Sequence, residues 1–139
     1  MTWDQVDLTG TEVTGQYVVL KANEVLAKYM PEVQKQADVI IVLSNMGYEE
    51  DQVLSSSVPG IDLIVGGRSR MPLAEGWENV ETGTVVVQAG SQGEWIGGCE
   101  LNVDSAGRVT SYASNLVLLT EDYPDDAEMR AFLNTYKAQ

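Results

Sequence analysis

Two short segments carry polar and charged side chains where a ligand site would need them. They are residues 44–47 (SNMG) and 66–70 (GGRSR), which follow the apolar runs 38–43 and 61–65. The second segment supplies two guanidinium groups, Arg68 and Arg70, which could grip a phosphate or a carboxylate through paired hydrogen bonds. The first supplies Asn45. Because ligands of α/β sheets bind at the carboxyl ends of the strands, we expect both segments to lie at one such edge.

The elements that would position these residues form a strand–helix–strand unit over residues 37–71. Both apolar runs are predicted to be strands buried on both faces, since short β-branched runs bounded by turn residues are typical of parallel sheets. Between them, residues 49–57 offer one or two helical turns, and Val58, Pro59 and Gly60 close that helix. The acidic cluster at residues 48–51 is predicted to interact favourably with the helix dipole.

This unit resembles the second half of the metallophosphoesterase domain of the 5′-nucleotidase family (calcineurin-like phosphoesterases). In that family the first segment reads Ser-His-x-Gly and the second Gly-Gly-His-Ser-His. The similarity continues through residues 83–91 and 97–109 and into the tail, residues 122–136. The resemblance implies half of a four-layer α-β-β-α sandwich, a site with two divalent metal ions and a periplasmic or extracellular location.

The three histidines of those motifs bind the metal ions in the family, and Asn45, Arg68 and Arg70 stand in their places here. A metal ligand needs a lone pair, and a protonated guanidinium has none to offer. The family's earlier ligand motifs, Asp-x-His, Gly-Asp and Gly-Asn-His, have no counterpart before residue 37. We therefore expect a degenerate site with no catalytic residue, no metal and no other cofactor.

Two roles remain open for the arginines. Arg68 and Arg70 could capture an anion, helped by the backbone N–H groups of Gly66 and Gly67. Alternatively, both could pair with nearby carboxylates, which are abundant in this chain.

The composition of the chain argues against several classes of function. The net charge of −13 argues against binding to nucleic acid or to anionic membrane surfaces, because both repel a polyanion. The chain contains no histidine, which excludes serine–histidine and cysteine–histidine catalysis within it. Cys99 is the only cysteine and cannot form an internal disulfide. No run is long enough to cross a membrane, and no signal peptide is visible.

The whole chain, residues 1–139, is predicted to be one α/β domain with an N-terminal arm at 1–16. We expect a mixed sheet of about five strands with helices on one side. Further strands are predicted at residues 84–88, 95–104 and 108–119, the last two joined as a hairpin through Gly107. Residues 17–20 are predicted to be a short strand or the lead into a helix. Residues 72–81 are predicted to be a loop anchored by Trp77.

Two helices flank these strands. Residues 21–36 have helical apolar spacing, with a kink or restart expected at Pro31. A terminal helix is predicted to be capped by Asp125 with Glu128 as its capping-box partner. The buried stripe of that helix would be Met129, Phe132, Leu133 and Tyr136.

The function expected from these features is a non-catalytic structural or interaction module in an assembly. The alternatives are a phosphoesterase piece completed by another chain, and an anion-binding module using Arg68 and Arg70. If the inner face of the sheet is apolar and exposed, something must cover it: a second copy of the chain, a partner protein or the N-terminal arm. We expect that face to include Trp95 or Ile96, Leu101, Val103, Val109 and Leu116.

Overall fold

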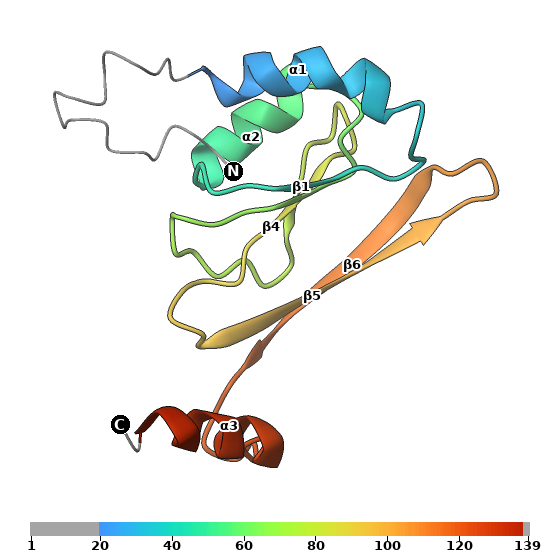
Figure 1. Cartoon of the computed structure of the whole chain (residues 1–139). Helices are drawn as coiled ribbons and strands as arrows, with labels where there is room; N and C mark the ends of the chain where they lie inside the picture. The colour runs from blue at the N-terminus through green and yellow to red at the C-terminus, as the bar shows by residue number, and fades with distance from the viewer. Residues whose placement is uncertain (1–19, 138–139) are drawn as a thin grey trace, which may run out of the picture.

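The computed structural model describes residues 20–137. The predicted arm and the predicted short strand or helix lead at 17–20, except Leu20, lie outside the described residues. The described part folds into three helices and six strands (Figure 1). In chain order they are α1 (Ala22–Val33), β1 (Ile41–Leu43), α2 (Tyr48–Ser57), β2 (Leu63–Val65), β3 (Trp77–Glu78), β4 (Val85–Val87), β5 (Trp95–Val103), β6 (Val109–Leu118) and α3 (Ala127–Lys137). Within this part of the chain, every helix is too short or too polar to cross a bilayer.

The strands form a mixed sheet and a separate hairpin. The sheet has the order β1-β2-β4-β3, in which β1, β2 and β4 are parallel and β3 runs antiparallel to β4. β5 and β6 pair only with each other. The predicted mixed α/β class is confirmed, but the expected single sheet of about five strands is four strands plus a two-stranded ribbon. The predicted loop at 72–81 contains β3, and its Trp77 packs against the core as expected.

Both α1 and α2 cover the same face of the sheet (Figure 1). Side chains alternate between the faces of a strand, so the central residue of each parallel strand points to the helices. These residues are Val42, Ile64 and Val86, which are paired in register. Ile64 and Val86 are fully buried and join Leu54 of α2 and Met30 of α1 in one hydrophobic core.

The opposite face of the sheet is covered unevenly. The hairpin lies against β2 and β4, where Leu63 and Val85 are buried. At the β1 edge, Ile41 and Leu43 point to this same face and are 52% and 76% exposed. The prediction that residues 38–43 form a strand buried on both faces was therefore wrong, because β1 is an edge strand that the hairpin does not cover.

Most of the hairpin's predicted bare face is turned toward the chain's own sheet. Leu116 lines a cavity of about 240 Å³ together with Leu63 and Val87, and Leu101 and Val109 are half-buried. Ile96 and Val103 remain about half exposed. Among the sheet strands, the exposed apolar side chains of this face lie mainly on β1.

Three predictions about helices were wrong. α1 continues through Pro31 and ends at Val33, two residues later, so the predicted restart at the proline does not occur. α3 is capped by Asp126, whose carboxylate accepts the Met129 N–H at 2.7 Å, while Asp125 pairs with Arg130. The stripe expected to be buried is at least half exposed at all four positions, and α3 lies at the far end of the molecule from α1 (Figure 1).

Candidate functional site

The loops that follow β1, β2 and β4 leave the sheet at the same edge, as the sequence predicts for the first two. The ladder continues one residue past the strands there. The Ser44 N–H donates to the Val65 carbonyl at 2.9 Å, and the Gly66 N–H donates to the Val87 carbonyl at 2.8 Å. The Gly66 N–H is therefore used by the sheet and cannot help to hold an anion, contrary to expectation. The Gly67 N–H has no acceptor within residues 20–137.

The structure brings Asn45 and Arg68 together at this edge. A Cβ atom on Gly67 would lie 3.0 Å from the Asn45 side-chain oxygen, and one on Gly47 would lie 3.8 Å from Cδ of Arg68. The Arg68 guanidinium donates a long hydrogen bond, 3.5 Å, to the Met46 carbonyl. Both loops are thus in contact, and their glycines permit the close approach.

Neither arginine is neutralised by a described carboxylate. The salt bridges within residues 20–137 join Lys21 to Glu24, Arg108 to Asp104 and Arg130 to Asp125. Arg70 has no side-chain hydrogen bond or ion pair in this part of the chain. The alternative in which both arginines pair with nearby carboxylates is therefore wrong for the described residues.

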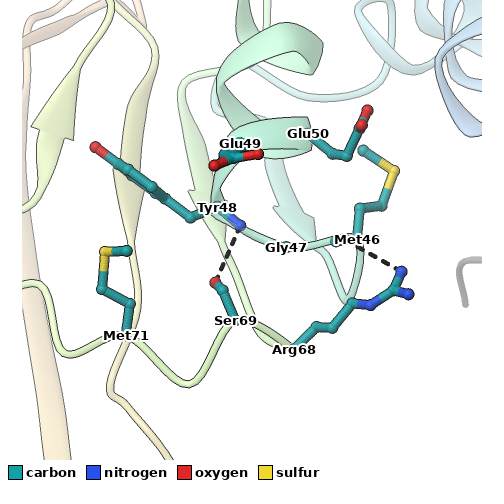
Figure 2. A pocket seen from close by; sticks show the side chains of 8 residues that line it. All are labelled: Met46, Gly47, Tyr48, Glu49, Glu50, Arg68, Ser69 and Met71. Atoms are coloured by element: carbon teal, nitrogen blue, oxygen red, sulfur yellow. Dashed lines mark hydrogen bonds between the residues drawn. The ribbon is translucent and has the colours of Figure 1, made fainter.

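A hollow of about 330 Å³ lies between the two loops and the first turn of α2 (Figure 2). Tyr48 and Met71 line one side of it, and Figure 2 shows the Arg68 guanidinium pointing to the other side, below Met46. The carboxylates of Glu49 and Glu50 also line the hollow. The two carboxylates would oppose an anion placed inside the hollow.

Asp51 departs most clearly from its predicted role. It was expected to be one of several acids that interact favourably with the dipole of α2, but its side chain is completely buried. Its Oδ1 accepts a hydrogen bond from the Ser44 hydroxyl, which in turn accepts the Met46 N–H at 3.1 Å. Its Oδ2 accepts no hydrogen bond from the described part of the chain and lies close to Gly66, where a Cβ would collide with it. Burial raises the pKa of this carboxyl above its usual value of 3.8, against the opposing effect of the Ser44 hydrogen bond.

A second buried group, Gln88, holds the arginine loop. Its Oε1 accepts hydrogen bonds from the Ser69 hydroxyl at 2.8 Å and from the Met71 N–H at 3.0 Å. Its Nε2 donates to the Gly67 carbonyl at 3.1 Å. The Ser69 hydroxyl also accepts the Tyr48 N–H at 3.0 Å, which ties the loop to the start of α2 (Figure 2).

Sequence reasoning missed this network of Ser44, Asp51, Ser69 and Gln88. The available signal was position, since Gln88 ends an otherwise apolar strand and Ser69 stands between the two arginines. Polar residues at strand ends are usually assigned to solvent, and nothing in periodicity distinguishes a buried one.

The donor atoms at this edge do not fit a divalent metal ion. Arg68 and Arg70 have no lone pair to give, and their positive charges repel a cation. Within residues 20–137 no group of three or more histidine, cysteine, aspartate or glutamate side chains is placed to hold a metal. We therefore derive no chemistry through bound metal.

Comparison with known proteins gives a consistent family. An uncharacterized metallophosphoesterase, YunD, of Bacillus subtilis is 33% identical over 119 residues, covering 85% of this chain and 25% of the relative. The human 5′-nucleotidase is 30% identical over 127 residues, covering 77% of this chain and 22% of the relative. No family model matches the chain.

The fold agrees with these relatives. The crystal structure of a 5′-nucleotidase precursor from Thermus thermophilus superposes with a TM-score of 0.76 at 29% identity, over 86% of this chain and 27% of that one. The chain thus spans about a quarter of the length of the relatives it matches. It belongs to the 5′-nucleotidase family of metallophosphoesterases and corresponds to a C-terminal part of their metallophosphoesterase domain.

Proposed function

We propose that this chain is a non-catalytic metallophosphoesterase-like module that works as a structural or interaction part of an assembly. The observation that carries the proposal is the pair of arginines, Arg68 and Arg70, at positions where the resembled motifs have metal-binding histidines. Guanidinium groups cannot activate a water molecule, and without a metal ion no Lewis acid polarises a phosphoryl oxygen.

Hydrolysis assays test this proposal. The purified full chain should not hydrolyse nucleotides or model phosphate esters above background, even with added manganese. Metal analysis of the same sample should find no stoichiometric zinc, manganese or iron. Metal-dependent hydrolysis that a chelator abolishes would refute the proposal.

The exposed apolar surface supports a role in an assembly. Ile41 and Leu43 are bare on the helix-free face of the sheet, and the apolar stripe of α3 is also exposed. Leaving such side chains in water forfeits about 25 cal/mol per Å² of apolar area. We propose that a second copy of the chain or a partner protein covers the sheet face. An extracytoplasmic location is proposed with it, since one relative, 30% identical, is a snake venom 5′-nucleotidase.

One alternative is a phosphoesterase whose remaining part comes from another chain. The chain spans about a quarter of the length of these relatives, so an activity like theirs would need residues beyond the given sequence. This alternative predicts that activity appears only when a second chain carrying the missing ligand motifs is mixed with this one. The non-catalytic proposal predicts no activity from that mixture, because Arg68 and Arg70 would still stand at the ligand positions.

A second candidate function is recognition of an anion such as phosphate or a phosphate ester. It is favoured by the absence of any described carboxylate partner for Arg68 and Arg70. The Gly67 N–H, which has no acceptor within residues 20–137, favours it too. Two guanidinium groups on one short loop could hold a dianion by charge-assisted hydrogen bonds.

Substituting the arginines tests this candidate. Arg68→Gln and Arg70→Gln should each weaken phosphate binding at least tenfold in a calorimetric or NMR titration, while unfolding free energy changes by about 1 kcal/mol or less. Arg108→Gln is the matched control, because Arg108 is exposed and already paired with Asp104 in the hairpin turn. If all three variants lose the same affinity for phosphate, the loss comes from the change in net charge, and a specific site is contradicted.

A further inference from the structure

The arginine loop adopts a backbone conformation that its residues would not choose alone. Arg68 has φ +72° and Arg70 has φ +56°, in the left-handed region that non-glycine residues rarely occupy. Such conformations cost free energy and persist where the surroundings fix them. A neighbouring group must therefore hold the arginine loop in this conformation.

The side chain of Gln88 makes the contacts that hold the arginine loop. Its side chain is 2% exposed and makes all its hydrogen bonds to the loop, at Gly67, Ser69 and Met71. These are alternate residues, and the two residues between them are the arginines with positive φ. These hydrogen bonds hold the loop on either side of each arginine. Arg68 and Arg70, both exposed, therefore keep their positive-φ conformations.

The same side chain links the loop to two elements. Gln88 follows β4 directly, so its backbone is fixed by the central parallel strands. Ser69, which donates to Gln88, accepts the Tyr48 N–H in the first turn of α2. Gly66 is packed so closely that a Cβ would lie 2.9 Å from Nε2 of Gln88. The loop therefore has little room to relax while Gln88 is in place.

We propose that Gln88 is the positioning residue of this site, holding residues 66–71 so that Arg68 and Arg70 are presented together to an oxyanion. The inference rests on the anion-binding candidate above for its ligand, an inorganic phosphate or a phosphate monoester. Its structural part stands on the hydrogen bonds of Gln88 alone. A preorganised loop binds without first paying to order its side chains and backbone.

Hydrogen exchange and phosphate titration of the full chain test the proposal together. Gln88→Leu keeps the side chain's bulk and removes all three hydrogen bonds. We expect the Met71 N–H to exchange about tenfold faster or more, since its only described acceptor is lost, and the Tyr48 N–H to follow. Phosphate affinity should fall as far as in Arg68→Gln. Gln88→Glu, which keeps Oε1 as acceptor, should retain more of the Met71 protection.

Val86→Ala is the matched control, because Val86 lies two residues before Gln88 on β4 and is buried in the core. It should lower global stability without selectively loosening residues 66–71. Unchanged Met71 exchange in Gln88→Leu, or equal loosening of the loop in Val86→Ala, would overturn the proposal. If inorganic phosphate shifts no resonance of the wild-type chain, the anion-binding function is refuted, while the exchange data still decide the role of Gln88.

Discussion

At the scale of single residues, the most consequential side chains are polar ones hidden under the loops. Asp51 is completely buried with one unpartnered oxygen, so its charged form is disfavoured there and its pKa is raised. In the unfolded chain the same group titrates at its ordinary value of 3.8. Asp51 therefore contributes stability that is complete below that value and is lost as pH rises through the higher pKa of the folded state.

Substitution of Asp51 by asparagine checks the sign of this effect. Asp51→Asn mimics the neutral carboxyl, so at pH 7 it should be at least as stable as the wild type in urea unfolding. Its advantage should shrink as the pH falls toward 4. Asp51→Ala should instead be destabilised by about 1–3 kcal/mol, because the Ser44 hydroxyl loses its buried acceptor.

The neighbouring exposed acid gives the control for that experiment. Glu49→Gln removes one charge from the same first turn of α2 at an exposed position, so it controls for the loss of a charge near the helix start. An Asp51→Asn protein that loses stability relative to wild type as the pH rises from 4 to 7 would contradict a raised pKa.

The position of the site could be predicted from the sequence, but the buried side chains that hold its loops in place could not. Two apolar runs ending in Ser44 and Gly66 were sufficient to place Asn45 and Arg68 at one edge of a parallel sheet. The burial of Asp51 and Gln88 depends on long-range packing, because each is covered by loops from other elements. Their residue types predict exposure, and only the three-dimensional arrangement reverses that prediction.

At the scale of elements, five of the six described strands were predicted within a few residues, but β3 and the covered faces of the strands were not. Periodicity identifies a strand and cannot state which neighbour lies over it. Residues 39–43 are all apolar, yet Ile41 and Leu43 are exposed because β1 ends the sheet. Likewise the stripe of α3 was recognised, while the described chain supplies nothing to cover it.

The close approach of the hairpin turn to the segment before β1 gives a prediction about stability. Gly107 has φ +78° in the turn between β5 and β6, and a Cβ there would lie 2.7 Å from Cβ of Asp38. Gly107→Ala therefore meets both the left-handed strain and a collision with the segment before β1. We expect it to lower the free energy of unfolding by about 2 kcal/mol or more in urea titration.

Gly93→Ala separates these two causes. Gly93 has a similar φ of +73°, but a Cβ there would meet no atom within 4 Å. It should cost only the conformational term, about 1 kcal/mol. If the two alanine variants are equally stable, the tip of the hairpin does not rest against Asp38 in solution.

At the scale of the whole molecule, the uncovered sheet face predicts association. The hairpin shields β2 and β4 but leaves the β1 side bare, with Leu43 76% exposed. Soluble monomers rarely leave a large contiguous apolar patch in water. A second copy could cover it about a two-fold axis, since an isologous interface would bring two such faces together.

Light scattering at micromolar concentration should therefore find the wild-type chain as an oligomer. Leu43→Ser should shift it toward monomer, because it removes an apolar side chain from the centre of the bare β1 face while leaving the core of Ile64 and Val86 intact. Val80→Ser is the matched control, since Val80 is 92% exposed in the connection between β3 and β4, and its loss should leave the oligomer unchanged.

A monodisperse wild-type monomer that binds no dye for exposed apolar surface would rule out self-association through this face. A monomer that does bind the dye would instead favour a partner protein as the missing cover, because the face would then be shown to be open and unfilled by a second copy.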